Sequence, residues 1–248
     1  MGLSNVATAV LYKCRSGARR RVREAVAAAL PARCALCARA TGPTGLCADC
    51  SASVAAPAGS CPGCALPSPG GARCGRCLAR PPAWDAALAA GVYAFPLDRL
   101  VVRLKYAGDL ALAAALGECL AGAAVASGAP ARVDALLPMP LAAARQRERG
   151  CNQAREIARA AANAISLPVA GGLRRSRHAV PQASLAWRER ARNVRGAFEA
   201  DASLAGARVA LVDDVMTSGA TATAATAALR RAGAARIEVW VVARTLPA

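Results

Sequence analysis

Two adjacent acids, Asp213 and Asp214, stand between an apolar run at residues 209–212 and a short polar loop. Carboxylates accept hydrogen bonds, and the paired hydroxyl groups of a ribose can donate them. An alanine-rich stretch at residues 222–232, which stops at Gly233, predicts a helix after the loop. The start of a helix offers unpaired N–H groups and a positive dipole end, which together bind phosphate. Strand, acid pair, loop and helix therefore predict a sugar-phosphate site.

The loop between the acids and the expected helix consists of small and hydroxyl-bearing residues, namely Thr217, Ser218, Gly219, Ala220 and Thr221. Its glycine and alanine let the backbone approach a ligand closely. An ordinary strand-to-helix turn with an aspartate cap is the alternative interpretation, but this order of residue types is more specific than such a turn needs. A nucleoside-triphosphate phosphate loop fits poorly, because no Gly-Lys-Ser/Thr sequence follows.

Eight of the eleven cysteines form two sets with identical spacing, which are Cys34, Cys37, Cys47 and Cys50, then Cys61, Cys64, Cys74 and Cys77. Each set contains two Cys-x2-Cys knuckles, and two knuckles complete a tetrahedral zinc site. Disulfides are the competing interpretation, but they suit a secreted chain. The repeat favours one zinc ion per consecutive set, while a cross-braced pairing of the first knuckle with the third stays open. Sites with four cysteines leave no open coordination position, so both zinc ions are expected to be structural.

The length of 248 residues suits one mid-sized domain and a small module. We expect a basic N-terminal segment at residues 1–30, a double zinc ribbon at residues 31–82 and an α/β domain at residues 83–248. The longest apolar stretch, residues 110–129, contains an acid and three glycines, so it predicts a soluble helix and no membrane span. The apolar run after the basic residues near the N-terminus is too short for an export signal, so we expect a cytoplasmic chain.

The apolar pattern of the α/β domain alternates between strands and helices. Strands are expected at residues 88–95, 134–140, 167–170, 209–213 and 237–242. Helices are expected at residues 97–106, 110–126, 151–165 and 222–232. A long, highly charged loop is expected at residues 173–198. This alternation predicts a mostly parallel sheet with helices on both faces and a ligand site beyond the carboxyl ends of the strands.

The formal net charge is +17, and only Lys13 and Lys105 are lysines. Residues 141–200 hold twelve arginines and four glutamates, and residues 1–24 hold six basic residues and one acid. Such a field attracts polyanions such as nucleic acids. A solvated basic face, or the arginine and alanine usage of a GC-rich genome, is the alternative explanation. Eight aromatic residues in the whole chain argue against an extensive base-stacking platform.

The string at residues 209–221 resembles the 5-phosphoribosyl-1-pyrophosphate (PRPP) motif of type I phosphoribosyltransferases. From about Cys34 onward, the chain is similar to the ComF/GntX family of double-zinc-ribbon proteins with a phosphoribosyltransferase domain, which are linked to DNA uptake in natural competence. The cysteine knuckles, the PRPP string and residues 104–109, 137–140 and 149–153 carry the likeness. The charged stretch from residue 173 to residue 195 also resembles the mobile loop region of amidophosphoribosyltransferases. One departure is Cys151, which stands where the family usually has an aromatic residue.

The resemblance implies a role for each part of the motif. Asp213 and Asp214 would hold the ribose hydroxyls, directly or through Mg²⁺, and the loop at residues 217–221 would bind the 5-phosphate. Four residues are candidates for the pyrophosphate side, namely Lys105, Met139, Arg145 and Arg149. An arginine fork matches phosphate oxygens well.

The same resemblance implies a PRPP-binding protein that assists single-stranded DNA uptake in natural transformation. Its expected partners are PRPP, single-stranded DNA and proteins of the competence machinery. An active phosphoribosyltransferase acting on a small nitrogenous acceptor and a PRPP-sensing regulator without turnover are the two alternatives. The sequence names no acceptor and no general base, so catalysis is left open.

Overall fold

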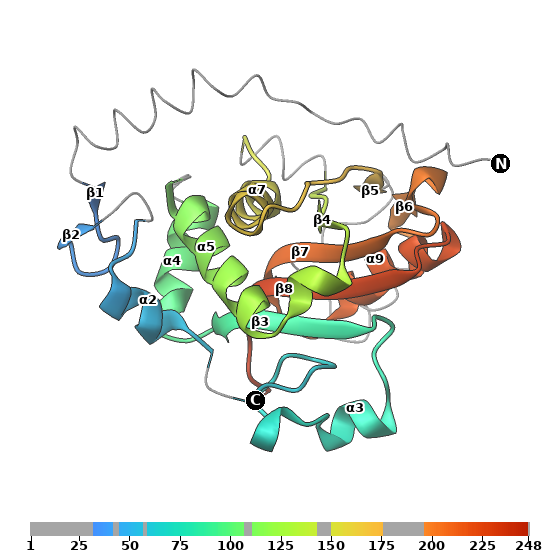
Figure 1. The fold of residues 1–248 in the computed structure, drawn as a ribbon, viewed down its shortest axis with the longest axis horizontal. Helices are drawn as coiled ribbons and strands as arrows, with labels where there is room; N and C mark the ends of the chain where they lie inside the picture. The colour runs from blue at the N-terminus through green and yellow to red at the C-terminus, as the bar shows by residue number, and fades with distance from the viewer. Residues whose placement is uncertain are drawn as a thin grey trace.

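The computed structural model describes residues 32–41, 45–56, 59–106, 111–142, 150–175 and 196–247. Its centre is a four-stranded sheet in the order β3-β8-β7-β4, and all three strand pairs are parallel (Figure 1). The strands are β3 (Ala86–Val92), β4 (Ala135–Pro138), β7 (Arg208–Met216) and β8 (Arg236–Arg244). The predicted mostly parallel sheet is therefore confirmed.

Helices cover both faces of this sheet (Figure 1). Three helices pack on one face, namely α4 (Leu97–Tyr106), α5 (Ala111–Ala126) and α7 (Gln153–Ile165). The opposite face is covered by α9 (Ala220–Arg231). The alternation of side chains along β7 explains the two layers, because Val209 and Leu211 pack with α9 while Ala210 and Val212 pack with the other three helices.

Close packing between α5 and α7 depends on small side chains. A Cβ atom added at Gly117 would lie 2.5 Å from the Cβ of Ala160, so only glycine fits at this crossing. Helix α7 begins at a side-chain cap, since Asn152 accepts a hydrogen bond from the backbone N–H of Arg155 at 3.3 Å. The start of α7 is thereby fixed beside the end of β4.

The end of β7 differs from the sequence prediction. The expected strand stopped at Asp213, but β7 continues through both acids to Met216. The reason is the neighbouring strand β8, which pairs Asp213 with Val241 and Val215 with Ala243 and so keeps the later residues extended. The acid pair therefore lies inside the C-terminal half of the strand and not in the turn after it.

Two other expected elements also differ. The strand expected at residues 167–170 is a single bridge between Val169 and Leu136. The long loop expected at residues 173–198 begins with β5 (Leu173–Arg175) and runs into β6 (Phe198–Ala200), which pair antiparallel. Buried Phe198 anchors this pair, a contact that local periodicity does not reveal. Residues 176–195 lie outside the described part of the chain.

The cysteine-rich segment is built of short elements. They are β1 (Ala32–Arg33), β2 (Ala40–Thr41), α2 (Ala48–Val54), the single turn η1 (Pro69–Gly71) and α3 (Gly75–Ala79). Two further single turns, η2 (Ala129–Arg132) and η4 (Ala202–Leu204), lie in the α/β part. Helix α2 is tied to the sheet, because the N–H of Ala56 donates to the carbonyl of Ala90 at 2.6 Å. Across the described ranges, every helix is too short or too polar to cross a membrane.

Candidate functional site

The eight cysteines gather into two clusters that follow the order of the sequence. The first cysteine cluster is Cys34, Cys37, Cys47 and Cys50, and the second cysteine cluster is Cys61, Cys64, Cys74 and Cys77. In each cluster the four sulfur atoms lie within 4.8 Å of one another. The structure therefore selects the consecutive pairing over the cross-braced one.

The sulfur spacing fits a tetrahedral zinc ion. Zinc–sulfur bonds of about 2.3 Å place two ligands of a tetrahedron about 3.8 Å apart. The sulfur atoms of Cys37 and Cys47 are 3.7 Å apart, and those of Cys64 and Cys74 are also 3.7 Å apart. Both clusters are consistent with zinc ribbons.

In the second cluster, backbone N–H groups favour the thiolate form of Cys61. Burial raises the pKa of Cys61, but the N–H groups of Cys74, Gly63 and Cys64 outweigh burial and lower the pKa to about 6. The N–H of Cys74 lies 3.3 Å from this sulfur. A thiolate is the form that binds zinc, so this turn stabilises the ligand state.

The acid pair lies near a cation from another element. Oδ2 of Asp214 is 3.1 Å from Nζ of Lys105 at the end of α4, and both side chains are largely buried. Burial and the negative charge of Asp214 raise the pKa of Asp213 to about 7. The charges of Lys105 and Arg175 oppose that rise, so both cations act on the acid pair.

The strand beside β7 brings a second predicted residue to the site. The N–H of Met139, directly after β4, donates to the carbonyl of Val212 at 2.8 Å. The carbonyl of Met139 accepts a hydrogen bond from the side chain of Asn152 at 3.0 Å. The segment expected on the pyrophosphate side therefore starts next to Asp213. Arg145 and Arg149, the other two candidates, lie outside the described residues.

Residues 217–221, which we call the phosphate loop after their predicted role, run from the end of β7 into the first turn of α9, which begins at Ala220. Gly219 is the residue before the helix and has a φ of +79°, a conformation that favours glycine. The hydroxyl of Ser218 accepts a hydrogen bond from the N–H of Ala220 at 3.3 Å, while Thr217 and Ser218 are exposed. The structure thus brings the acid pair, the phosphate loop, Lys105 and Met139 to the carboxyl end of the sheet.

Sequence reasoning missed three residues around this site. Arg175 on β5 acts electrostatically on Asp213, and its guanidinium lies 5.5 Å from the ring centre of Phe198. Trp84 and Arg244 are buried against the phosphate loop. The only sequence signal for Arg244 is a charged residue directly after the apolar run at residues 239–243.

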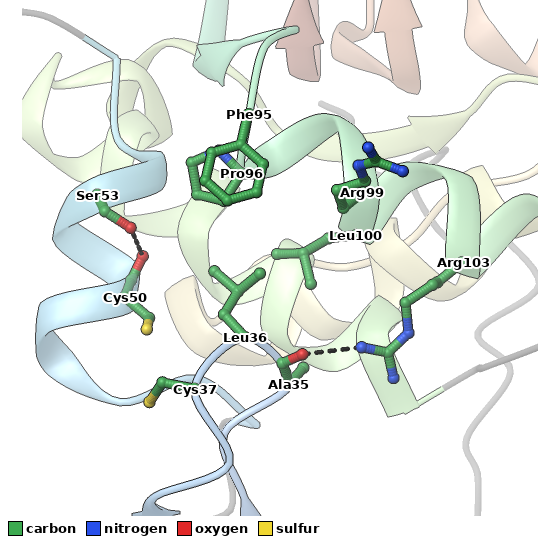
Figure 2. Close-up of a pocket in the computed structure, with 10 residues that line it drawn as sticks. All are labelled: Ala35, Leu36, Cys37, Cys50, Ser53, Phe95, Pro96, Arg99, Leu100 and Arg103. Atoms are coloured by element: carbon green, nitrogen blue, oxygen red, sulfur yellow. Dashed lines mark hydrogen bonds between the residues drawn. The ribbon is translucent and has the colours of Figure 1, made fainter.

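A groove of about 460 Å³ lies between the first cysteine cluster and α4 (Figure 2). Leu36 and Leu100 form apolar parts of its wall, and Phe95 stands at its edge with 79% of its surface exposed. Two guanidinium groups, those of Arg99 and Arg103, lie along the same side, and Arg103 donates to the carbonyl of Ala35 at 2.8 Å. None of the ten lining residues belongs to the acid pair or to the phosphate loop.

Two protein-family models match the chain. The double zinc ribbon domain matches residues 25–78, and the phosphoribosyl transferase domain matches residues 150–246. The first range contains both cysteine clusters, and the second contains the acid pair and the phosphate loop.

Curated relatives match almost along their full length. The DNA utilization protein YhgH of Salmonella typhi is 32% identical over 225 residues, which cover 88% of this chain and 99% of the relative. The protein of the same name from Escherichia coli K12 is 31% identical over 224 residues, with the same two coverages. Competence protein F of Haemophilus influenzae is 32% identical over 178 residues, which cover 69% of this chain and 78% of the relative.

Solved structures match about half of this chain. A glutamine PRPP amidotransferase from B. subtilis, complexed with ADP and GMP, has a TM-score of 0.36 at 24% identity and is matched by 52% of this chain. A structure described as the allosteric regulatory enzyme of purine biosynthesis has a TM-score of 0.34 at 22% identity. The match spans 25% and 26% of the lengths of these two proteins.

Proposed function

This chain belongs to the ComF/GntX family of double-zinc-ribbon proteins with a phosphoribosyltransferase domain, and on that basis we propose that it binds PRPP with Mg²⁺. The observation that carries the proposal is the acid pair on β7, the strand that ends at Met216 directly before the phosphate loop, together with the 3.1 Å contact between Asp214 and Lys105. A negatively charged pair, a phosphate-binding loop and a cation are the three features that a ribose carrying a 5-phosphate and a pyrophosphate requires.

Each part of PRPP meets a group of suitable chemistry. Asp213 and Asp214 accept hydrogen bonds from the ribose hydroxyls, and the N–H groups at the start of α9 bind the 5-phosphate. Lys105 and the segment that begins at Met139 approach the pyrophosphate. Adjacent carboxylates are ligands of the kind that Mg²⁺ uses together with substrate phosphates, so the donor set fits this ion. When bound, Mg²⁺ supplies positive charge that neutralises the pyrophosphate.

Lys105 has a separate role before the ligand arrives. Its ammonium group partly neutralises Asp214 in the free protein, which lowers the cost of keeping two carboxylates side by side. A compact ammonium on a flexible stem can turn from a carboxylate to a phosphate oxygen without leaving the site. Lys105 would therefore exchange Asp214 for the pyrophosphate as PRPP binds.

Calorimetry of PRPP binding in the presence of Mg²⁺ tests this assignment. Changing Asp213→Ala and Asp214→Ala together should weaken binding by at least about 100-fold, because two charge-assisted acceptors are removed. The matched control is Asp49→Ala with Glu199→Ala, which removes the same charge from two exposed positions. Equal affinity in the two double variants would show that the acid pair does not bind the sugar.

Binding and turnover are separated by a different measurement. A mass-spectrometric search for PRPP consumption across a metabolite extract would reveal a phosphoribosyltransferase that acts on a nitrogenous acceptor. Binding without consumption supports either a PRPP-sensing regulator or a DNA-handling protein. The Asp213→Ala and Asp214→Ala double variant is the control for contaminating activity.

A second proposed function is the handling of single-stranded DNA, which the names of the relatives and the groove of Figure 2 support. An exposed aromatic ring beside cationic side chains is an arrangement on which bases stack and phosphates bind. Phe95, Arg99 and Arg103 supply this combination.

Two arginines of the basic stretch at residues 141–200 are paired with acids. Arg159 pairs with Glu156 at 2.9 Å, and Arg174 pairs with Asp201 at 2.9 Å. Those at residues 145–149 and 177–195 lie outside the described part of the chain. The groove beside α4 is therefore the DNA surface that we propose.

Fluorescence anisotropy with labelled single-stranded DNA over a salt series tests this surface. Phe95→Ala should weaken binding by at least about fivefold without changing the salt dependence, because base stacking contributes about 1–3 kcal/mol per base. Arg99→Ala should reduce the salt slope by about one, as expected for one phosphate contact. Arg231→Ala, an exposed arginine on α9, is the control. No binding by the wild type at low salt would contradict a DNA role and favour genome composition as the origin of the arginine excess.

A further inference from the structure

Two buried side chains connect the second cysteine cluster to the phosphate loop. They are Trp84, which is 7% exposed, and Arg244, which is 4% exposed. Trp84 lies in the segment between the cluster and β3, and Arg244 is the last residue of β8. Both side chains form a hydrogen bond to the knuckle between Cys61 and Cys64. Arg244 also contacts the end of β7 and the first residue of the phosphate loop, whereas Trp84 contacts Gly219 in that loop.

Arg244 forms the first connection through backbone carbonyl groups. Its Nε donates to the carbonyl of Cys64 at 2.9 Å. Its Nη1 donates to the carbonyl of Met216 at 2.8 Å and also to the carbonyl of Thr217, the first residue of the phosphate loop. A guanidinium is planar and rigid, so the positions of these carbonyls are tied to one another.

The charge of Arg244 is also linked to the cluster. The side chain of Arg244 is buried, and its Nε donates to the carbonyl of Cys64, a member of the cluster. A zinc ion with four thiolates carries a net negative charge, because the four thiolates outweigh one divalent cation. The loaded cluster therefore stabilises the buried positive charge that holds the loop.

Trp84 forms the second connection. Its indole N–H donates to the carbonyl of Gly63, inside the first knuckle of the cluster, at 2.7 Å. The far edge of its ring covers Gly219, where an added Cβ would lie 2.9 Å from Cη2 of Trp84. The left-handed conformation of Gly219 is thus held under a ring that the knuckle itself orients.

The first cysteine cluster has contacts of a different kind. The carbonyl of Ala35, which lies between Cys34 and Cys37, accepts a hydrogen bond from Arg103 on α4 at 2.8 Å. The hydroxyl of Ser51 lies 3.8 Å from the sulfur of Cys119 on α5. These contacts join the first cluster to the helices α4 and α5 on the face of the sheet opposite α9. Only the second cluster therefore has the contacts to the phosphate loop described above.

We propose that the second cysteine cluster holds the phosphate loop in its binding shape through Arg244 and Trp84, so that metal loss at this cluster weakens PRPP binding. Trp84 and Arg244 are positioning residues in this arrangement. The choice of PRPP as ligand rests on the proposed function, whereas the connection between cluster and loop does not. The cysteines fit zinc as described above, and zinc, when bound, fixes the knuckle that carries the carbonyls of Gly63 and Cys64.

Loss of the metal should change how much of the time the phosphate loop has its binding shape. Without the metal, the knuckle no longer holds those two carbonyls, and Arg244 loses both an acceptor and a compensating charge. The phosphate loop then spends only a fraction of its time in the shape that binds phosphate, and the apparent affinity falls by that fraction. Other surfaces of the domain keep their packing.

A matched pair of cysteine variants tests the inference in the full chain. Cys74→Ser removes one ligand from the second cluster, and Cys47→Ser removes the equivalent ligand from the first. The two positions are comparable, because each residue precedes a short helix, α3 or α2, and each is partly buried. Calorimetry with PRPP and Mg²⁺ should show at least a tenfold loss for Cys74→Ser and less than a threefold change for Cys47→Ser.

A second measurement does not depend on the ligand. Hydrogen–deuterium exchange of the peptide that covers residues 213–223 reports the order of the loop in the absence of PRPP. Exchange there should accelerate about tenfold or more in Cys74→Ser and remain as in the wild type in Cys47→Ser. If the wild type fails to bind PRPP but this difference appears, the proposed ligand is wrong and the connection between cluster and loop stands.

Two conservative variants keep the test decisive if Cys74→Ser does not fold. Trp84→Phe keeps a ring over Gly219 but cannot donate to Gly63, and Arg244→Lys keeps the charge but cannot span the carbonyls of Cys64 and Met216. Each should accelerate exchange of residues 213–223 while zinc content stays at the wild-type value. Wild-type exchange in both variants, or equal acceleration in the two cysteine variants, would overturn the inference.

Discussion

Lys105 and Asp214 join two elements that are far apart in the sequence, because Nζ of Lys105 at the end of α4 lies 3.1 Å from Oδ2 of Asp214 on β7. Asp214 also adjoins Asp213, whose pKa is raised by burial and by the charge of Asp214. The positive charge of α4 therefore acts on both carboxylates. The contact places the single described lysine at the site where pyrophosphate is expected.

Replacing Lys105 should weaken the binding of the pyrophosphate part of PRPP more than the binding of its ribose 5-phosphate part. We expect Lys105→Gln to weaken PRPP binding by about tenfold or more, since hydrogen bonds to charged groups contribute about 1.5–3 kcal/mol. Ribose 5-phosphate lacks the pyrophosphate, so its affinity should change by less than about threefold. Calorimetry with both ligands checks this, with Arg155→Gln on the exposed side of α7 as the control. Equal losses for the two ligands would mean that Lys105 acts through Asp214 alone.

The raised pKa of Asp213 predicts a dependence of stability on pH. Its pKa is about 7 in the folded protein and near 3.9 in an unfolded chain. The folded protein therefore binds more protons between these values, and its stability falls as the pH rises toward 7. Asp213→Asn removes this effect, so its gain in melting temperature over the wild type should grow between pH 5.5 and 7.5. Between these two pH values, the stability advantage of Asp213→Asn over the wild type should increase by an amount on the order of 1 kcal/mol. This corresponds to about 2–4 °C in melting temperature for a chain of this size.

Asp134 provides a control of opposite sign for that experiment. A side-chain hydrogen bond from Arg208 lowers the pKa of Asp134, so the stability that this pair contributes is present above the ordinary aspartate pKa. Asp134→Asn should lower the melting temperature by the same amount at pH 5.5 and pH 7.5. A gain for Asp213→Asn that is constant over this range would contradict the raised pKa.

Two zinc ions should leave the protein at different rates. In the first cluster Cys37 is exposed and only Cys34 is buried, whereas three of the four cysteines in the second cluster are buried. We expect elemental analysis to find two zinc ions per chain and a chelator to release them in two phases. Cys47→Ser should leave only the slow phase and Cys74→Ser only the fast one. The reverse assignment, or one zinc ion in the wild type, would show that burial does not control access.

Glu238 is a buried acid at the opposite end of the sheet, and it contributes to stability alone. It is 1% exposed and accepts hydrogen bonds from Arg132 at 2.8 Å, from Arg236 at 3.0 Å and from Trp240 at 3.0 Å. Glu238→Gln leaves two half-buried guanidinium groups without a countercharge, so urea unfolding should show a loss of about 1.5–3 kcal/mol. Glu199→Gln at an exposed position should cost less than about 0.5 kcal/mol. A loss below about 1 kcal/mol for Glu238→Gln would mean that water replaces the carboxylate.

Local patterns in the sequence were sufficient for several parts of this protein. The helix predicted at residues 97–106 has the bounds of α4, because its apolar spacing reflects one face of one helix. The two cysteine sets pair as their repeat indicated, because each knuckle and its partner lie close along the chain. Alternating strands and helices likewise indicated a parallel sheet with both faces covered. The role of the acid pair and the phosphate loop in binding PRPP remains a prediction.

Contacts between distant segments decided the rest. Strand β7 continues to Met216 because β8 pairs with it, and β5 and β6 pair across a segment of more than twenty residues. Trp84 and Arg244 join the second cysteine cluster to the phosphate loop only because the sheet order places β3 beside β8 and β8 beside β7. Periodicity records which face of an element is apolar, but not which neighbour that face meets. The partners of Lys105, Trp84 and Arg244 therefore emerge only from the packed sheet.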